Sequence, residues 1–231
     1  MSEHTVKAYD EELAFLSAET ARMGRLAVAQ VRDAVKAVVS GDTALGERVI
    51  DGDAELDLAE AGIEQAAVKL IALRQPVSVD LRDVISAMKI AGNLERCGDL
   101  GKNIAKRALV MSGAKLRSPA TGSVERMGQL VVARLGQVME ASRDKNIELA
   151  AQVWRRDEEI DQQYDALFRE LLTFMMGDPV TITASTHLLF IAKNIERIGD
   201  HATNVAEMVY YAATGKTLPD RERGPDIQLE D

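Results

Sequence analysis

The segment IERIGDHATN, residues 195–204, repeats with few changes as LERCGDLGKN, residues 94–103. Both segments place a glutamate, an aspartate and an asparagine four residues apart. The six residues are Glu196, Asp200 and Asn204 in the later segment and Glu95, Asp99 and Asn103 in the earlier one. Side chains four residues apart lie on one face of an α-helix. Each segment therefore predicts a helix with a row of side-chain oxygens, and the repetition indicates a duplicated unit.

Other features of the sequence recur at nearly the same separation. A pair of aspartates four residues apart also occurs twice, with an offset of 104 residues. The pairs are Asp53 with Asp57 and Asp157 with Asp161. Pro76 matches Pro179 with an offset of 103, and the two oxygen-bearing rows are offset by 101. Small changes of offset are expected in a duplicated unit, because turns tolerate deletions.

The segments between the turns predict long helices. Proline, glycine and serine gather in a few short stretches, and the predicted helices cover about 9–39, 42–73, 79–111, 124–143, 146–176 and a last segment that ends near 213. Asp42 is expected to cap the second helix. No alternation of strands and helices is visible, which favours an all-α fold. We expect two tandem, pseudo-symmetric bundles of three antiparallel helices, six long helices in all.

A segment rich in serine and glycine, SGAKLRSPATGS at residues 112–123, marks the boundary between the halves. We expect the first repeat to cover residues 1–113, a linker 114–122 and the second repeat 123–214. The remaining residues, 215–231, are expected to form a polar C-terminal tail.

Composition disfavours several classes of partner. The formal net charge of −9 disfavours nucleic acid and anionic lipid as partners, because both require basic surface. The single cysteine, Cys97, allows no disulfide within the chain and fits a reducing compartment. The first residues form no apolar signal core, and no apolar run approaches ~18 residues. We therefore expect a cytoplasmic protein that does not insert into a membrane.

The acidic rows are expected to line a groove in each repeat. At 100° per residue, the apolar positions of the last helix, from Ile191 to Val209, form one stripe, and Glu196 and Asp200 fall beside it or beyond it. The helix over 79–111 has the same geometry. If the second and third helices of a repeat pack antiparallel, the aspartate pair of one faces the row of the other. Four carboxylates and an amide would then converge in each half.

Two interpretations of these grooves remain open. One is a solvated acidic face, since 37 of the 231 residues are aspartate or glutamate. The other is a cation site, because stacked like charges weaken a helix by ~0.2–0.5 kcal/mol per pair unless something neutralises them. Carboxylate and amide oxygens suit Mg²⁺, Mn²⁺ or Ca²⁺ and also accept iron or Zn²⁺. The candidate ligands are Asp53, Asp57, Glu95, Asp99, Asn103, Asp157, Asp161, Glu196, Asp200 and Asn204.

No pattern of catalytic residues accompanies the acidic rows. The Glu-x-x-His pairs of redox di-iron bundles are missing, as are Cys/His zinc patterns and nucleotide-binding fingerprints. We therefore expect no enzyme. Gly98 and Gly199 predict close helix packing, because a glycine inside a helix costs ~1 kcal/mol relative to alanine. Cys97 falls on the apolar stripe and is expected to be a core thiol.

Two longer segments carry a family resemblance. PVSVDLRDVISAMKIAGNLERCGDLGKNIAKRAL, residues 76–109, and HLLFIAKNIERIGDHATNVAEMVYYAATG, residues 187–215, resemble the two signature stretches of the PhoU family of phosphate-uptake regulators. The resemblance extends over essentially the whole chain. One departure separates the two copies: residues 100–102 read Leu-Gly-Lys, whereas residues 201–203 read His-Ala-Thr. The resemblance therefore applies less directly to metal binding in the first half.

The resemblance implies a fold and a function. It implies two three-helix bundles whose acidic motifs hold metal ions, with Glu95/Asp99 and Glu196/Asp200 facing the two aspartate pairs. It also implies a cytoplasmic negative regulator of the phosphate response, and we expect a homodimer. Such a regulator links the ATP-binding subunit of a phosphate ABC transporter to a membrane-bound sensor histidine kinase.

Three alternatives remain. The chain could be a metal-storage or metal-dependent enzyme built on a helical bundle, or a structural scaffold whose acids bind no metal. It could also be a PhoU-like regulator of a low-affinity phosphate permease.

Overall fold

The computed structural model describes residues 2–113, 118 and 120–218, and in this part of the chain it is built from helices with no strand. The first repeat contains α1 (Ser2–Ser40), α2 (Thr43–Arg74) and α3 (Ser78–Gly113). The second contains α4 (Thr121–Asp144), α5 (Ile147–Arg155), α6 (Glu158–Gly177), a 3₁₀ turn η1 (Pro179–Thr181) and α7 (Ile182–Thr214). The expected all-α fold of two three-helix bundles is confirmed. The expected linker over 114–122 lies mostly outside the described residues, as does most of the expected tail.

The turns of the first repeat follow from local chemistry. Gly41 has a φ of 67°, a conformation that glycine adopts without steric cost. Asp42 then caps α2, because its side chain accepts a hydrogen bond of 2.9 Å from the backbone N–H of Leu45, as predicted. At its other end α2 stops at Gln75, in the left-handed region, directly before Pro76.

One predicted helix is interrupted. A single helix was expected over 146–176, but α5 and α6 are separated by Arg156 and Asp157. Arg156 has φ −96° and ψ 14°, outside the α region, and its N–H is shared between the carbonyls of Gln152 and Val153. The break leaves Asp157 buried, in contact with α7. In the first repeat α2 passes the equivalent position without interruption.

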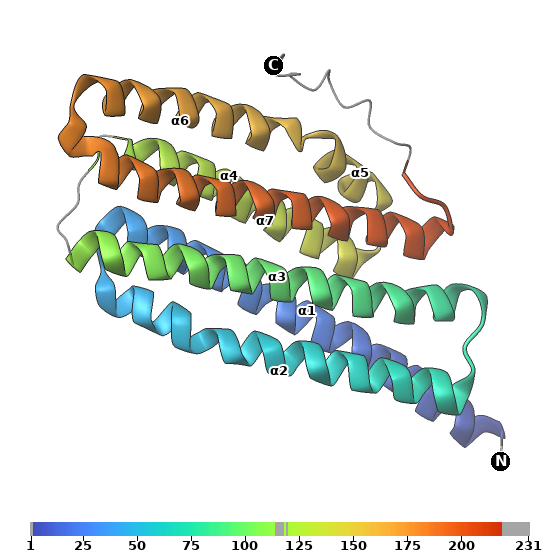
Figure 1. Cartoon of the computed structure of the whole chain (residues 1–231). Helices are drawn as coiled ribbons and strands as arrows, with labels where there is room; N and C mark the ends of the chain where they lie inside the picture. Colours follow the sequence, from blue (N-terminus) through green and yellow to red (C-terminus); the bar gives the residue numbers. More distant parts are fainter. Residues whose placement is uncertain (1, 114–117, 119, 219–231) are drawn as a thin grey trace, which may run out of the picture.

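The two bundles pack against each other along their length. Figure 1 shows α1–α3 forming one layer of the molecule and α4–α7 the other. Helix α3 lies along α7, and α1 lies along α4. Buried apolar side chains of both repeats form one continuous core. Cys97 belongs to this core and is fully buried, which confirms its predicted role and raises the pKa of the thiol well above its usual value.

Among the described residues, no helix combines the length and the apolar character that crossing a membrane requires.

Candidate functional site

In each repeat a glycine allows the second helix to approach the third. A Cβ atom on Gly98 of α3 would collide with Leu56 Cδ1 of α2. A Cβ atom on Gly199 of α7 would lie 2.7 Å from Ile160 Cδ1 of α6. The prediction of close helix packing at these glycines is confirmed. The close approach brings the aspartate pair of the second helix beside the acidic row of the third, and an acidic groove forms in each repeat.

The first acidic groove, between α2 and α3, contains a lysine as its own cation. Asp53 is buried, with 3% of its surface exposed. Its carboxylate accepts hydrogen bonds from Gln30 Nε2 at 2.9 Å and from the ammonium of Lys102. The same ammonium lies 3.6 Å from Asp99 Oδ1. Gln30 also donates to the Gly98 carbonyl at 3.1 Å, which fixes its amide between α1 and α3.

Towards the surface of the first groove the carboxylates are more crowded. Arg96 lies 3.4 Å from Glu95 and 3.6 Å from Asp99. Burial, followed by repulsion from Asp99, raises the pKa of Glu95 to about 7. Burial and the neighbouring Glu64 similarly raise the pKa of Glu60 on α2. The outer part of this groove therefore carries more negative charge than its arginine neutralises.

The second acidic groove, between α6 and α7, has a neutral group where the first has its lysine. Asp157 is buried and accepts a hydrogen bond of 2.8 Å from Thr203 Oγ1. Thr203 occupies the position equivalent to Lys102, and Arg134 occupies the position equivalent to Gln30. Arg134 forms its ion pair with Glu159 at the start of α6.

Carboxylates repel one another in the second groove. Partial desolvation, followed by repulsion from Glu196, Asp157 and Asp161, raises the pKa of Asp200 to about 6. One oxygen of Glu196 pairs with Lys193 at 2.6 Å, but the other is buried without a hydrogen-bond partner. A buried carboxylate oxygen without a partner is costly, so this groove has an unmet requirement for positive charge or a donor.

The two asparagines predicted as ligands do not join the buried aspartates. Asn204 Nδ2 donates to Asn93 Oδ1 on α3 at 3.3 Å, and His201 Nδ1 lies 3.0 Å from the same oxygen. Asn204 is thus directed toward the other repeat. Asn103 and Asp57 are both exposed. The residues brought together are therefore the buried aspartate of the second helix, the acids of the third and, in the second repeat, Asp161, whose charge acts on Asp200.

The two grooves differ in how well they fit a metal ion. As the side chains stand, no group of three or more His, Cys, Asp or Glu residues among 2–113, 118 and 120–218 is arranged to hold an ion. In the second groove the oxygen donors and the unpartnered Glu196 oxygen fit a hard cation. In the first groove the Lys102 ammonium already lies between Asp53 and Asp99, and the residues do not fit one.

The residues Gln30, Lys102 and Arg134 were not among the predicted site residues. Gln30 and Arg134 come from the first helix of each repeat, far along the chain from the acidic rows. The exchange of Lys102 for Thr203 was visible in the sequence, and it is the signal that distinguishes the grooves.

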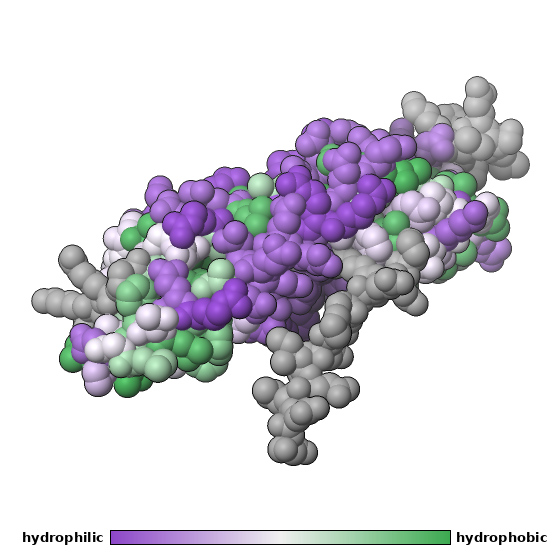
Figure 2. Space-filling model, turned by 90° about the horizontal axis from the view of Figure 1, so that it is seen from above, coloured by the Kyte–Doolittle hydropathy of each residue, from purple (hydrophilic) through white to green (hydrophobic). Residues whose placement is uncertain are grey.

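Exposed apolar side chains recur at the turn that joins the second and third helices of each repeat. Leu73, Val77 and Val79 in the first repeat match Met176, Val180 and Ile182 in the second, each with an offset of 103. All six are between 45% and 86% exposed. The two turns lie at opposite ends of the molecule (Figure 1). Figure 2 shows hydrophobic surface at the left end, where the α6–α7 turn lies, beyond a broad hydrophilic middle.

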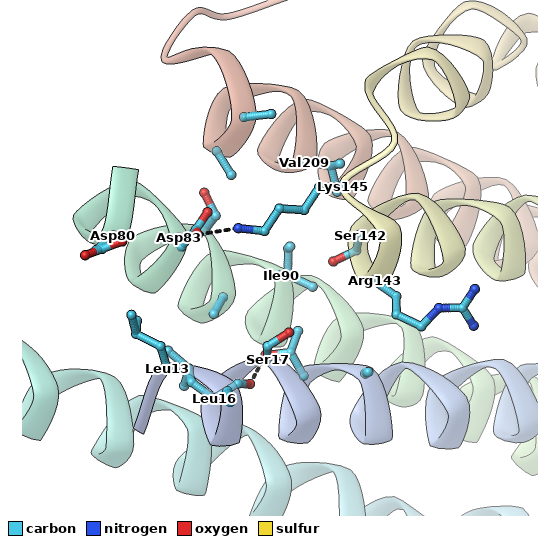
Figure 3. A pocket seen from close by; sticks show the side chains of 17 residues that line it. Leu13, Leu16, Ser17, Asp80, Asp83, Ile90, Ser142, Arg143, Lys145 and Val209 are labelled. Atoms are coloured by element: carbon cyan, nitrogen blue, oxygen red, sulfur yellow. Dashed lines mark hydrogen bonds and ion pairs between the residues drawn. The ribbon is translucent and has the colours of Figure 1, made fainter. Parts of the chain in front are cut away.

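A cleft of about 380 Å³ opens where the two repeats meet, between α1, α3, the α4–α5 turn and the end of α7 (Figure 3). Lys145 of the second repeat pairs with Asp83 of the first at 2.6 Å. Asp80 accepts a hydrogen bond of 2.8 Å from the Tyr9 hydroxyl, and Arg143 pairs with its neighbour Asp144. Each of these charged groups therefore already has a partner within the protein. The acidic grooves therefore remain the candidate site.

The fold and the grooves define an all-α protein of two repeats, each with an acidic groove and an exposed apolar turn. The family model described as the PhoU domain matches residues 20–108 and 124–209, one match in each repeat. The chain therefore belongs to the PhoU family, as the signature stretches predicted.

Named relatives align over nearly the whole chain. A phosphate-specific transport system accessory protein PhoU homolog of Caulobacter vibrioides is 53% identical, over 98% of this chain and 99% of its own. The protein of the same name from Rhizobium meliloti is 48% identical, over 96% and 94%. A crystal structure of PhoU from Pseudomonas aeruginosa superposes with a TM-score of 0.87 at 33% identity, over 90% of this chain and 100% of that one.

Proposed function

We propose that the protein is a non-enzymatic, cytoplasmic accessory regulator of phosphate transport that restrains the phosphate-starvation response. In this proposal it is an adaptor, a homodimer that binds the ATP-binding subunit of a phosphate ABC transporter and a sensor histidine kinase. Family membership over both repeats supports the regulatory role, and the relatives' names point to phosphate transport.

The observation that carries the adaptor proposal is the repeated apolar turn. An apolar side chain that is exposed singly needs no explanation, but the same three positions are exposed and apolar in both repeats. Because these side chains are exposed and lie outside the core, the stability of the fold does not explain why they recur. A bundle with an equivalent apolar surface at each end can contact two protein partners at once, which an adaptor requires.

Co-purification of the tagged chain with the transporter subunit and with the kinase tests this proposal. Val77→Asp and Val180→Asp each place a charge in one apolar turn without touching the core, and each is expected to weaken capture of a partner at least tenfold. Val68→Asp is the control, since Val68 is 57% exposed on α2 but lies outside both apolar turns. Undiminished capture of both partners by both turn variants would contradict the proposal.

We also propose that the second groove holds a divalent cation, with Mg²⁺ and Mn²⁺ as the first candidates. Asp157, Asp161, Glu196 and Asp200 would hold it. Such an ion would supply positive charge that stabilises the mutually repelling carboxylates and fixes the faces of α6 and α7. Support comes from the raised pKa of Asp200 and from the unpartnered oxygen of Glu196. Elemental analysis of protein purified without chelator should find metal, and Asp161→Ala/Asp200→Ala should lose it.

A further inference from the structure

We propose that Lys102 takes the place of a metal ion in the first groove, so that the metal capacity of the chain lies in the second groove alone. For the second groove the inference rests on the proposed function. For the first it rests on the side chains of that groove, and it departs from the symmetry that the duplicated sequence suggests.

The position of the Lys102 ammonium excludes a second cation. It contacts both Asp53, whose side chain is 4% exposed, and Asp99. These two carboxylates are the donors that a metal ion at the base of the groove would need. A divalent ion there would either lie beside a positive charge at short range or displace the ammonium from both carboxylates.

The hydrogen bonds around Asp53 reinforce this exclusion. Gln30 directs its amide N–H toward Asp53 and the Gly98 carbonyl. Asp53 thus has two donors and little remaining need for a cation. The carboxylate is paired with an ammonium and accepts hydrogen bonds from two donors inside the protein, which is the condition under which a buried charge is tolerated.

In the second groove other residues stand at the positions equivalent to Lys102 and Gln30. Thr203 offers Asp157 a neutral hydroxyl, and Arg134 is held by Glu159. The exchange of lysine for threonine therefore removes from the second groove the ammonium that occupies the first. It follows that metal addition should alter the second repeat and leave the first unchanged.

The test measures Mn²⁺ binding by equilibrium dialysis in a background that lacks the second groove, Asp161→Ala/Asp200→Ala. This background is expected to bind no Mn²⁺ at concentrations that saturate the wild-type chain. Lys102→Thr added to it should create one Mn²⁺ site, and Asp99→Asn should abolish that new site. Lys102→Arg, which keeps the positive charge, should create none. If circular dichroism shows that Lys102→Thr does not fold, Lys102→Gln replaces it, because its amide can still donate to Asp53.

Two results would overturn the inference. One is Mn²⁺ bound by the background itself and lost on Asp99→Asn, which would place a metal beside Lys102. The other is a folded Lys102→Thr or Lys102→Gln variant that gains no Mn²⁺. If the second groove of the wild-type chain binds no Mn²⁺, only the proposal of a metal ion in that groove is overturned. The Lys102 variants are compared in a background that lacks the second groove, so they test the first groove separately.

Discussion

At the scale of single residues, the two repeats use the same buried aspartate in different electrostatic settings. The spacing of acids along α2, α3, α6 and α7 was predictable, because residues four apart share a helix face. Their partners were not predictable in the same way, since Gln30 and Arg134 reach the grooves from another helix. Only tertiary packing decides that Gln30 bonds to Asp53 while Arg134 bonds to Glu159.

Lys102→Met should destabilise the metal-free protein by about 2–3 kcal/mol. Removing one partner of a buried ion pair typically costs 3–5 kcal/mol, and the partial exposure of Lys102 places the effect below that range. Urea unfolding in EDTA measures the change. Lys106→Met is the matched control, since Lys106 is exposed on the same helix and should shift stability by less than about 0.5 kcal/mol. Equal effects of the two substitutions would show that Lys102 does not compensate Asp53.

Glu95 should make the metal-free protein less stable as the pH rises. Its pKa is about 7 in the folded chain and 4.5 ordinarily, so folding favours the protonated form. The associated stability is fully present below pH 4.5 and is lost as the pH rises through about 7. Urea midpoints measured in EDTA should fall across this window, and Glu95→Gln should flatten the fall. Glu47→Gln, at an exposed position on α2, should keep the wild-type profile. A profile that Glu95→Gln leaves unchanged would contradict this origin of the pH dependence.

At the scale of helices, turns were easier to predict than a break inside a helix. Asp42 and Pro76 carry local chemistry that ends or begins a helix in any context. The break between α5 and α6 has no such signal, because Arg156 and Asp157 are compatible with a continuous helix. The contact of Asp157 with Thr203 on α7 is a tertiary interaction. The sequence pattern of a single segment therefore cannot predict this contact.

The glycines at the helix crossings should be intolerant of even one methyl group. Gly98→Ala and Gly199→Ala each force a Cβ atom against a large side chain of the neighbouring helix, and should cost about 1–3 kcal/mol despite the better helix propensity of alanine. Gly62→Ala, on exposed α2 surface with nothing within 4 Å of its Cβ position, should instead stabilise by about 0.5–1 kcal/mol. Thermal unfolding ranks the three variants. A stabilised Gly199→Ala would mean that α6 shifts without cost.

At the scale of the whole molecule, the duplicated sequence predicted two bundles and left their mutual packing open. The structure shows α3 along α7 and one core through both repeats. His201 and Asn204 of the second repeat meet Asn93 of the first, and Lys145 pairs with Asp83. These contacts connect residues more than 60 positions apart, so no local pattern contains them. The repeats should therefore behave as one cooperative unit.

Unfolding of this unit can be followed by two probes that report on different parts of the chain. Trp154 is the only tryptophan and donates to Glu207 at 3.2 Å within the second repeat, whereas far-ultraviolet circular dichroism reports on both repeats. Because the core is shared, the two urea transitions should coincide. Leu94→Ala, at a fully buried site in the first repeat, should cost about 2–5 kcal/mol and move both transitions together. A Trp154 transition that stays at its wild-type midpoint in Leu94→Ala would mean that the second repeat folds independently, and that the contact between α3 and α7 does not couple the two halves.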